Sequence, residues 1–221
     1  MTPDVAFPHV TIRTMTDYLI APNAHQRFTI IQQMKNQIGR RHFAPYYQVS
    51  RRAIRSYHAG NVNAIQNEIQ RLARSRADLD GSELARANNN LRVLTDYLEN
   101  FGSKALTYTG RQFEPLIVNG IRISTEPTLS GTLVTGRRTF ECNVVVDTQE
   151  DAPVEPEIDY ALELIYRGSS LSHPTPLRGA QYWHASSGDS WELTRSSTRR
   201  WRDIQDAAHE IALRWPTVRP R

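Results

Sequence analysis

The spacing of apolar residues changes from helical to extended at Gly102, and this change constrains the fold more than any other feature of the sequence. Before Gly102, apolar residues recur at intervals of three and four, which predicts a helix from Ser82 with the stripe Leu84, Ala87, Leu91, Leu94, Leu98 and Phe101. After it come short apolar runs separated by turn residues, which are typical of strands. We therefore predict an α+β fold, with a helical N-terminal half followed by a small, mostly antiparallel or mixed sheet flanked by helices.

The N-terminal half contains four further segments with helical spacing. Pro3 and Pro8 indicate an irregular lead-in over residues 1–12, and the first helix ends before Pro22 because the residue preceding a proline is biased away from helix. Asparagines supply N-caps and glycines supply C-terminal stops, and Val62 is expected to face inward. The expected helices cover about 14–20, 24–37, 45–59 and 61–76.

The C-terminal half begins with a clear hairpin signal. Asn119-Gly120 joins two short apolar runs, and two more strands are expected at 133–135 and 139–148 around Gly136. Alternation in the second of these predicts one buried face, formed by Phe140, Cys142, Val144 and Val146. Further on we expect a helix over about 157–166, a loop, a strand pair around Ser187-Gly188-Asp189 and a last helix from a cap at Ser196 or Ser197 to Trp215.

Length and composition indicate one domain over residues 1–221, with a helical subregion 1–102 and a strand-rich α+β subregion 103–221. A domain of this size buries roughly 70% of its unfolded surface, so it needs no disulfide or metal to fold. The one cysteine, Cys142, has no partner for an internal disulfide, which favours the cytoplasm. No signal peptide pattern is found, and no run approaches the ~18 apolar residues of a membrane span.

Arginine supplies nearly all the positive charge of the chain. The net charge is +4, and Lys35 and Lys104 are the only lysines. Because a guanidinium pairs bidentately with phosphate or carboxylate, this usage favours nucleic acid or an acidic partner. A GC-rich coding sequence would enrich arginine without any function, and this simpler explanation stays open.

Signatures of several common enzyme classes are absent from the sequence. There is no phosphate-binding glycine loop, no Gly-x-Ser-x-Gly elbow, no His-Glu-x-x-His and no Cys-x-x-Cys. Only His173 and His184 lie within one short region, and two such histidines are more typical of surface or packing positions than of a metal site. Spacing alone therefore identifies no metal ligand.

The segment 117–148 combines a hairpin with a strand that carries acidic residues. It includes STEPTLSG, with Glu126 before Pro127, and FECNVVV, with Glu141. This order, with helices before it, resembles the core of the PD-(D/E)XK nucleases, which include restriction enzymes and RecB-like nucleases. The resemblance implies a site in which an acidic residue after proline and a Glu-x-Lys on the next strand hold a divalent metal and orient a water for phosphodiester hydrolysis.

The match departs from that family at two positions. Thr128 stands where the family has an aspartate, and Asn143 stands where it has the lysine. The resemblance therefore implies a degenerate site, whose remaining acidic candidates are Glu126 and Glu141, with Glu114 or Asp147 as a further ligand. The simpler interpretation is that Glu126 and Glu141 are solvent-facing strand residues opposite an apolar face. The wider layout also resembles uncharacterised bacterial proteins whose last helix ends in Ile-Ala-x-x-Trp, as IALRW does here.

Two arginine clusters are candidate nucleic-acid contacts. The first is Arg51, Arg52 and Arg55, opposite an apolar face that contains Ala53 and Ile54. The second is Arg199, Arg200 and Arg202, beside Trp201. Arginines interleaved with aromatic rings neutralise phosphates and stack on unpaired bases. The structural alternative for the second cluster is that Trp201 is core and the arginines cover a helix face or pair with Asp203 and Asp206.

Two hypotheses of different classes follow, with an enzyme as a third. The first is a nucleic-acid-binding protein, for DNA or RNA, on a degenerate nuclease-like core without catalysis and without a cofactor. The second is a protein-interaction subunit of a larger bacterial assembly, for example a defence complex, with no chemistry of its own. The third is a metal-dependent nuclease, which requires Glu126 and Glu141 to converge on a Mg²⁺ ion.

Overall fold

A mixed five-stranded sheet lies at the centre of the structure, a computed structural model that describes residues 8–37, 46–110, 113–171 and 179–219. In the order β2-β5-β6-β7-β8, β6 and β7 run parallel and the other neighbouring pairs are antiparallel. The strands are β2 (Leu106–Tyr108), β5 (Leu129–Thr135), β6 (Arg138–Asp147), β7 (Gly179–His184) and β8 (Ser190–Leu193). The helices that precede this sheet in the chain confirm the predicted α+β class.

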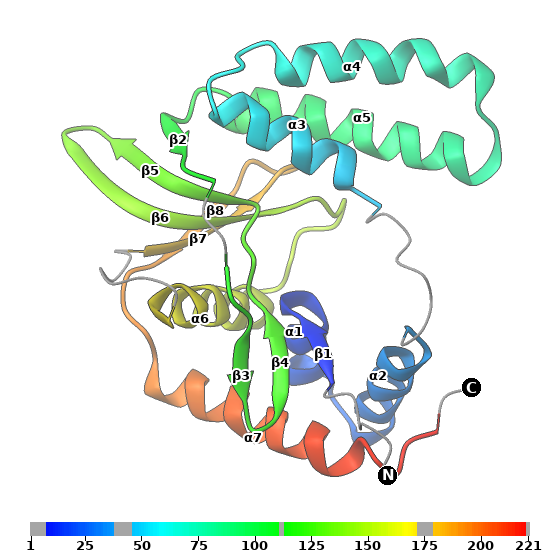
Figure 1. Ribbon diagram of the computed structural model, residues 1–221, viewed down its shortest axis with the longest axis vertical. Coiled ribbons are helices and arrows are strands. Elements are labelled where there is room, and N and C mark those ends of the chain that lie inside the picture. Colours follow the sequence, from blue (N-terminus) through cyan, green and yellow to red (C-terminus); the bar gives the residue numbers. More distant parts are fainter. Residues whose placement is uncertain (1–7, 38–45, 111–112, 172–178, 220–221) are drawn as a thin grey trace.

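Three helices lie on one side of the five-stranded sheet, and the middle one in chain order packs on the other two, as Figure 1 shows. They are α3 (Gln48–His58), α4 (Ala64–Ser75) and α5 (Gly81–Phe101), with a short 3-10 turn at Arg76–Asp78. At the end of α5, Phe101 stacks on Trp183 of β7 with ring centroids 4.9 Å apart. Both rings are buried, and large aromatic side chains contribute most of the apolar burial in such a contact. The predicted stripe of α5 therefore anchors the helical layer on the sheet.

One helix, α6 (Glu155–Leu171), covers the opposite face of the sheet. Parallel strands need a long crossover, and α6 provides it between β6 and β7. The helix extends past its expected end at Tyr166. In this extension Gly168 permits close packing, since a Cβ there would lie 2.1 Å from Thr125 Oγ1. The predicted apolar face of β6 is buried in the core under α3 and α5. Asn143 on the other face is also 0% exposed, so α6 covers a second face that the alternation did not predict.

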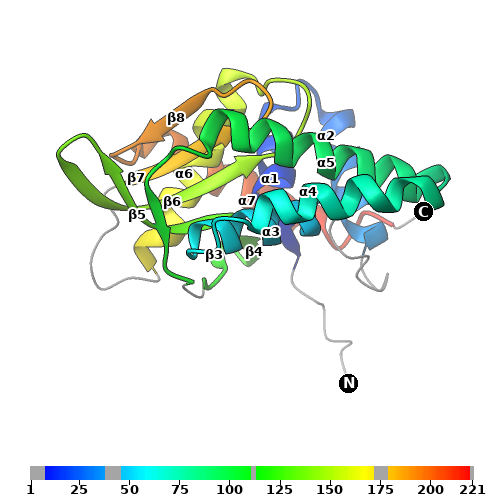
Figure 2. The same ribbon diagram turned by 90° about the horizontal axis from the view of Figure 1, so that it is seen from above.

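A smaller sheet and three more helices form a second core. The strands, in the order β1-β4-β3, are β1 (His9–Thr11), β4 (Ile121–Ser124) and β3 (Leu116–Val118). The helices are α1 (Ile12–Ile20), α2 (Ala24–Gln37) and α7 (Thr198–Arg214). α6 joins this core to the first, because Leu164 packs here while Ile165 packs on the five-stranded sheet. The first helices of the chain therefore lie apart from α3, α4 and α5 (Figures 1 and 2).

Several local predictions are confirmed. The hairpin between β3 and β4 turns at Asn119 and Gly120, whose φ angles of 47° and 79° are those of a type I′ turn. Ser197 caps α7, since its hydroxyl accepts a hydrogen bond from the Arg200 amide at 3.3 Å. The last helix also buries the predicted stripe, with Trp201 half-buried at its start and Ile204, Ala208, Ile211 and Trp215 buried.

Other local predictions are wrong, and for β1 and β5 the reason is pairing with a distant or neighbouring strand. The expected lead-in contains β1, which pairs with β4, and the Pro8 carbonyl accepts a hydrogen bond from the Arg122 amide at 2.9 Å. α4 begins later than expected, and Val62, predicted to face inward, is 70% exposed. β5 starts at Leu129 because its whole length pairs with β6. The expected start of the third helix at residue 45 lies outside the described residues.

The parallel pairings bring several strand ends to one region. Thr11 and Ser124 are register partners at the carboxyl ends of β1 and β4, and Asp147 ends β6. Ligand sites in α/β sheets form beyond the carboxyl ends of parallel strands, where side chains from separate segments converge. Among the described helices, even the 21-residue α5 lacks the apolar run that a bilayer-spanning helix requires.

Candidate functional site

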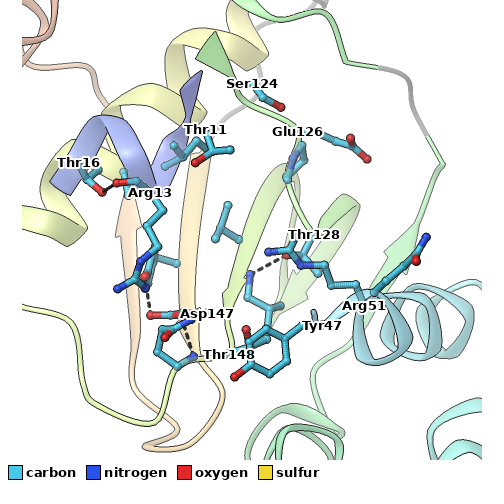
Figure 3. A pocket seen from close by; sticks show the side chains of 18 of the residues that line it. Thr11, Arg13, Thr16, Tyr47, Arg51, Ser124, Glu126, Thr128, Asp147 and Thr148 are labelled. Atoms are coloured by element: carbon cyan, nitrogen blue, oxygen red, sulfur yellow. Dashed lines mark hydrogen bonds between the residues drawn. The ribbon is translucent and has the colours of Figure 1, made fainter. Parts of the chain in front are cut away.

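A polar cleft of about 650 Å³ lies where these strand ends meet helices α1, α3 and α6. Figure 3 shows Thr11 and Ser124 at one end of it, and Asp147, Thr148 and Tyr47 at the other. Its volume is in the range typical of small-molecule and nucleotide-sized sites. The cleft is therefore the place where residues from distant segments of the chain could act on one ligand.

One wall of the cleft is the basic face of α3. Gln48, Arg51, Arg52 and Arg55 follow helical spacing and line the cleft, while Ala53 and Ile54 on the other side of the helix are buried against the sheet. This confirms the predicted division of α3 into an apolar and a basic face. The sheet holds α3 through its apolar face, which fixes the direction in which the arginines point.

Arg55 is held by groups of the protein itself. Its guanidinium pairs with the Glu126 carboxylate at 2.9 Å and donates to the carbonyl oxygens of Pro127 and Thr128 at 3.0 and 2.8 Å. These bonds tie the start of α3's last turn to the connection between β4 and β5. Arg55 therefore stiffens the cleft wall and has little capacity left for a ligand.

Arg51 and Arg52 differ from Arg55 in this respect. Neither side chain forms a hydrogen bond or an ion pair with any residue in the described part of the chain, and both are exposed at the cleft. Partial burial and the neighbouring Arg55 charge lower the pKa of Arg51, while Glu126 and Asp147 oppose that effect. An arginine remains charged under these conditions, so the α3 wall presents two cations with unfilled hydrogen-bonding capacity.

The floor of the cleft is acidic. Asp147, only 8% exposed, accepts hydrogen bonds from the Tyr182 hydroxyl at 2.7 Å and from the Gln149 amide at 3.0 Å. Burial and the adjacent Asp147 carboxylate raise the pKa of Tyr182, so this hydroxyl stays a donor. The two bonds hold the carboxylate in one orientation and leave part of its acceptor capacity unused, since a carboxylate has about four lone-pair sites.

Glu157 and Arg13 complete the floor. Burial raises the pKa of Glu157, the Arg13 charge opposes this, and the carboxylates of Asp17 and Asp147 add to it. Arg13 stands near the start of α1, 3.9 Å from Asp17, and in Figure 3 its side chain extends toward Asp147. The α3 wall thus carries two guanidiniums without a partner among the described residues, and the floor carries carboxylates together with the single guanidinium of Arg13.

The structure places only one of the two predicted catalytic candidates at the cleft. Glu126 lines it, in the connection between β4 and β5, and pairs with Arg55. Glu141 is a half-buried residue of β6 opposite Thr132, six positions before Asp147, which is roughly 20 Å along an extended strand. The cleft lining does not include Glu141, so the structure does not bring Glu126 and Glu141 together. Glu114 is likewise outside the lining, whereas Asp147 is central to it.

The two positions that depart from the nuclease pattern serve the fold. Thr128 is buried, and its hydroxyl accepts a hydrogen bond from the Val146 amide at 3.1 Å. The buried Asn143 amide donates to the Ser169 hydroxyl of α6. His184 is also buried, with its ring nitrogens at 2.8 Å from the Ser187 hydroxyl and 3.2 Å from the Gln149 carbonyl, while His173 lies outside the described residues.

The second arginine cluster lies far from the cleft, at the end of the molecule opposite α3 in Figure 1. Arg199 and Arg202 are exposed there at the start of α7, whereas Arg200 pairs with Asp159 of α6 at 2.5 Å. Trp201 packs against the second core, and the Arg167 guanidinium lies 4.8 Å from its ring centroid. The structure therefore does not combine the two clusters into one surface.

Sequence reasoning did not identify Arg13, Tyr47 and Glu157 as site residues. They belong to the starts of three helices that the chain order separates widely, and no local motif marks them. Asp147 had a usable signal: it is the first acidic residue after a buried apolar strand, at its carboxyl end.

The known proteins give no assignment for this site. In the described residues, His, Cys, Asp and Glu side chains do not gather in groups of three or more that could hold a metal ion. No protein-family model matches the chain, and no curated protein is significantly similar to it in sequence. The arguments about function therefore rest on the cleft.

Proposed function

We propose that the protein binds nucleic acid, DNA or RNA, in the cleft, with phosphates on the arginines of α3, and that it does not cleave the strand. The observation that carries this proposal is the pair Arg51 and Arg52, which line the cleft and have no hydrogen-bond or ion-pair partner among the described residues. Repulsion between adjacent guanidiniums is relieved when a phosphate binds between them, and the released counterions add to the affinity.

The start of α1 supports an anionic ligand. Thr11 caps this helix, its hydroxyl accepting from the Thr14 amide at 3.1 Å, and the first helical residues Ile12 and Arg13 line the cleft. The unpaired amides and the dipole at a helix N-terminus favour negative charge nearby. This contribution adds to that of Arg51 and Arg52, which stand on a different element.

Binding without cleavage is supported by the chemistry of the two degenerate positions. The neutral side chains of Thr128 and Asn143 are committed to the Val146 amide and the Ser169 hydroxyl, inside the sheet and against α6. Neither side chain carries the carboxylate or the ammonium group that the nuclease family uses on a phosphodiester, and both are buried. A cytoplasmic location is part of the same proposal and rests on Cys142.

The test is a titration of the purified protein against labelled single- and double-stranded DNA and RNA at 50 and 200 mM salt, with and without Mg²⁺. Each sample is also run on a denaturing gel for cleavage. We expect binding that weakens as salt rises and strands that stay intact in Mg²⁺. Cleavage that requires Mg²⁺ would favour the nuclease alternative, and the absence of binding at 50 mM salt would favour the protein-interaction alternative.

A further inference from the structure

The polarity of the cleft suggests how a bound strand is oriented within it. Phosphates suit the α3 wall, but the floor carries Asp147, an acceptor that is fixed by two hydrogen bonds and nearly closed off from solvent. A carboxylate in such a place repels a phosphate and attracts a hydrogen-bond donor. A ligand that fills the cleft therefore has an anion at one end and donor groups at the other, as a nucleotide with an amino-bearing base does.

We propose that the cleft binds single-stranded nucleic acid with one base turned toward Asp147, and that it prefers bases with an exocyclic amino group over thymine or uracil. This inference rests on the proposed function and specifies its ligand. The phosphates that flank the inserted base lie on Arg51 and Arg52. Tyr47, which lies at the same end of the cleft as Asp147, offers an aromatic surface on which the base can stack (Figure 3).

The requirement for a single strand follows from the position of Asp147. Its exposed fraction of 8% means that only a group inserted into the cleft reaches it. In a duplex the base edges are paired and stacked, and taking a base out costs a few kcal/mol of unpairing and unstacking. A single strand avoids this cost, because its bases are already free to leave the stack.

The preference for an amino group follows from hydrogen-bonding chemistry. Carboxylates accept hydrogen bonds from the N4 amino group of cytosine, whereas thymine and uracil present O4, an acceptor, at the same place. An acceptor facing Asp147 would leave both groups without a donor in a buried site. Such a mismatch is rejected more strongly than the loss of an apolar contact.

The charged groups around Asp147 are compatible with this arrangement. Arg13 extends toward it from α1 and Glu157 stands on α6, yet within the described residues Asp147 forms no ion pair within 4.0 Å. Its hydrogen bonds come from the Tyr182 hydroxyl of β7 and the Gln149 backbone amide, and these two bonds fill only part of the about four acceptor sites of a carboxylate. Acceptor capacity toward the cleft therefore remains for a ligand.

The experiment compares 12-mers of deoxycytidine and deoxyuridine by fluorescence anisotropy with the full-length protein at 50 mM salt. The two strands have equal charge and similar stacking and differ in the N4 amino group and the N3 site. We expect the cytosine strand to bind about tenfold more tightly, the effect of one hydrogen bond to a charged acceptor. A blunt duplex of the same length, without unpaired bases, should bind more weakly than the cytosine strand.

Variants locate the preference. Asp147→Asn should remove most of the cytosine preference, since an amide can also donate to O4 of uracil. Glu141→Gln makes the same carboxylate-to-amide change on β6 outside the cleft and should keep the preference. If Asp147→Asn does not fold, the comparison of cytosine with uracil strands by the unchanged protein still decides the question.

The outcomes separate this inference from the function it rests on. If no strand binds, the proposed function fails and the inference fails with it. If cytosine and uracil strands bind equally well, or if Asp147→Asn keeps the full preference, the inference is overturned while nucleic-acid binding stands. Tighter binding of the duplex than of the cytosine strand would also overturn it.

Discussion

The double substitution Arg51→Ala with Arg52→Ala should flatten the salt dependence of nucleic-acid binding by an amount that the structure sets. Each phosphate contact to a single strand contributes roughly 0.7 to the slope of log affinity against log salt concentration. Of the three α3 arginines that line the cleft, Arg51 and Arg52 lack partners among the described residues, so about two contacts are lost. The slope should therefore become less negative by about 1.4. Between 50 and 200 mM salt, the affinity of the variant should then fall by a factor about sevenfold smaller than the affinity of the unchanged protein.

Arg55 is left out of this count for a structural reason. Its guanidinium is occupied by Glu126 and by the carbonyl oxygens of Pro127 and Thr128, so it makes at most a partial phosphate contact. Substituting Arg55 would also disturb the connection between β4 and β5, and a change in binding could then come from the fold. The double variant of Arg51 and Arg52 removes only exposed side chains that the described structure does not use.

The matched control is Arg199→Ala with Arg202→Ala, which removes the same charge from the exposed start of α7 at the other end of the molecule. Anisotropy titrations at four salt concentrations give the slope for the unchanged protein and for both variants. The reasoning is refuted if the α3 variant keeps the slope of the unchanged protein. A slope that falls only in the α7 variant would place the nucleic acid on the second arginine cluster.

Three further predictions concern the fold. Burial lowers the pKa of His58, whose Nδ1 donates to the Leu106 carbonyl and whose Nε2 accepts from the Tyr97 hydroxyl. The unfolded chain therefore takes up a proton before the folded one as the pH falls below about 6.5. The free energy of unfolding, measured in urea, should fall there by up to about 1.4 kcal/mol per pH unit, and by less in His58→Gln. Burial raises the pKa of Cys142 to about 12, so its thiol should resist a disulfide reagent in the native protein and react on unfolding, and rapid native labelling would contradict its burial. Glu163 is 0% exposed, and its carboxylate accepts hydrogen bonds from the Ser196 hydroxyl, the Ser197 amide and the Arg167 guanidinium. Glu163→Ala should therefore lower the free energy of unfolding by about 3 kcal/mol in urea titrations, and an unchanged midpoint would refute this role.

The elements predicted from the sequence are those that local interactions specify. The stripe of α5, the Asn119-Gly120 turn and the Ser197 cap each depend on residues within a few positions of one another, and the structure confirms all three. β1 could not be predicted in this way, because a three-residue strand is stable only through its pairing with β4, more than a hundred positions away. The second covered face of β6 has the same origin, since it depends on where α6 packs.

The candidate site divides along the same line. The basic face of α3 follows from helical spacing within one segment, so the arginines could be predicted. Asp147 also had a local signal, but its meeting with Glu157 on the floor could not be predicted. Asp147 and Glu157 meet only because the chain leaves β6, turns into α6 and returns along β7. The prediction for Glu141 failed for a related reason. Glu141 lies on β6, as Asp147 does, but six residues before it, which places it roughly 20 Å along the strand from Asp147.

Binding and cleavage consequently make separate demands on this chain. Phosphate binding depends on Arg51 and Arg52, exposed side chains that the described structure leaves without partners. Cleavage on a nuclease-like core would depend on the positions of Thr128 and Asn143, which hydrogen-bond to β6 and α6. An acidic residue in place of Thr128 would bury a charge and remove the hydroxyl that accepts from the Val146 amide, which costs several kcal/mol. Because the fold itself uses these two residues, catalytic side chains at their positions would require repacking of β6 and α6, whereas in the proposed mode the strength of binding can change through α3 alone.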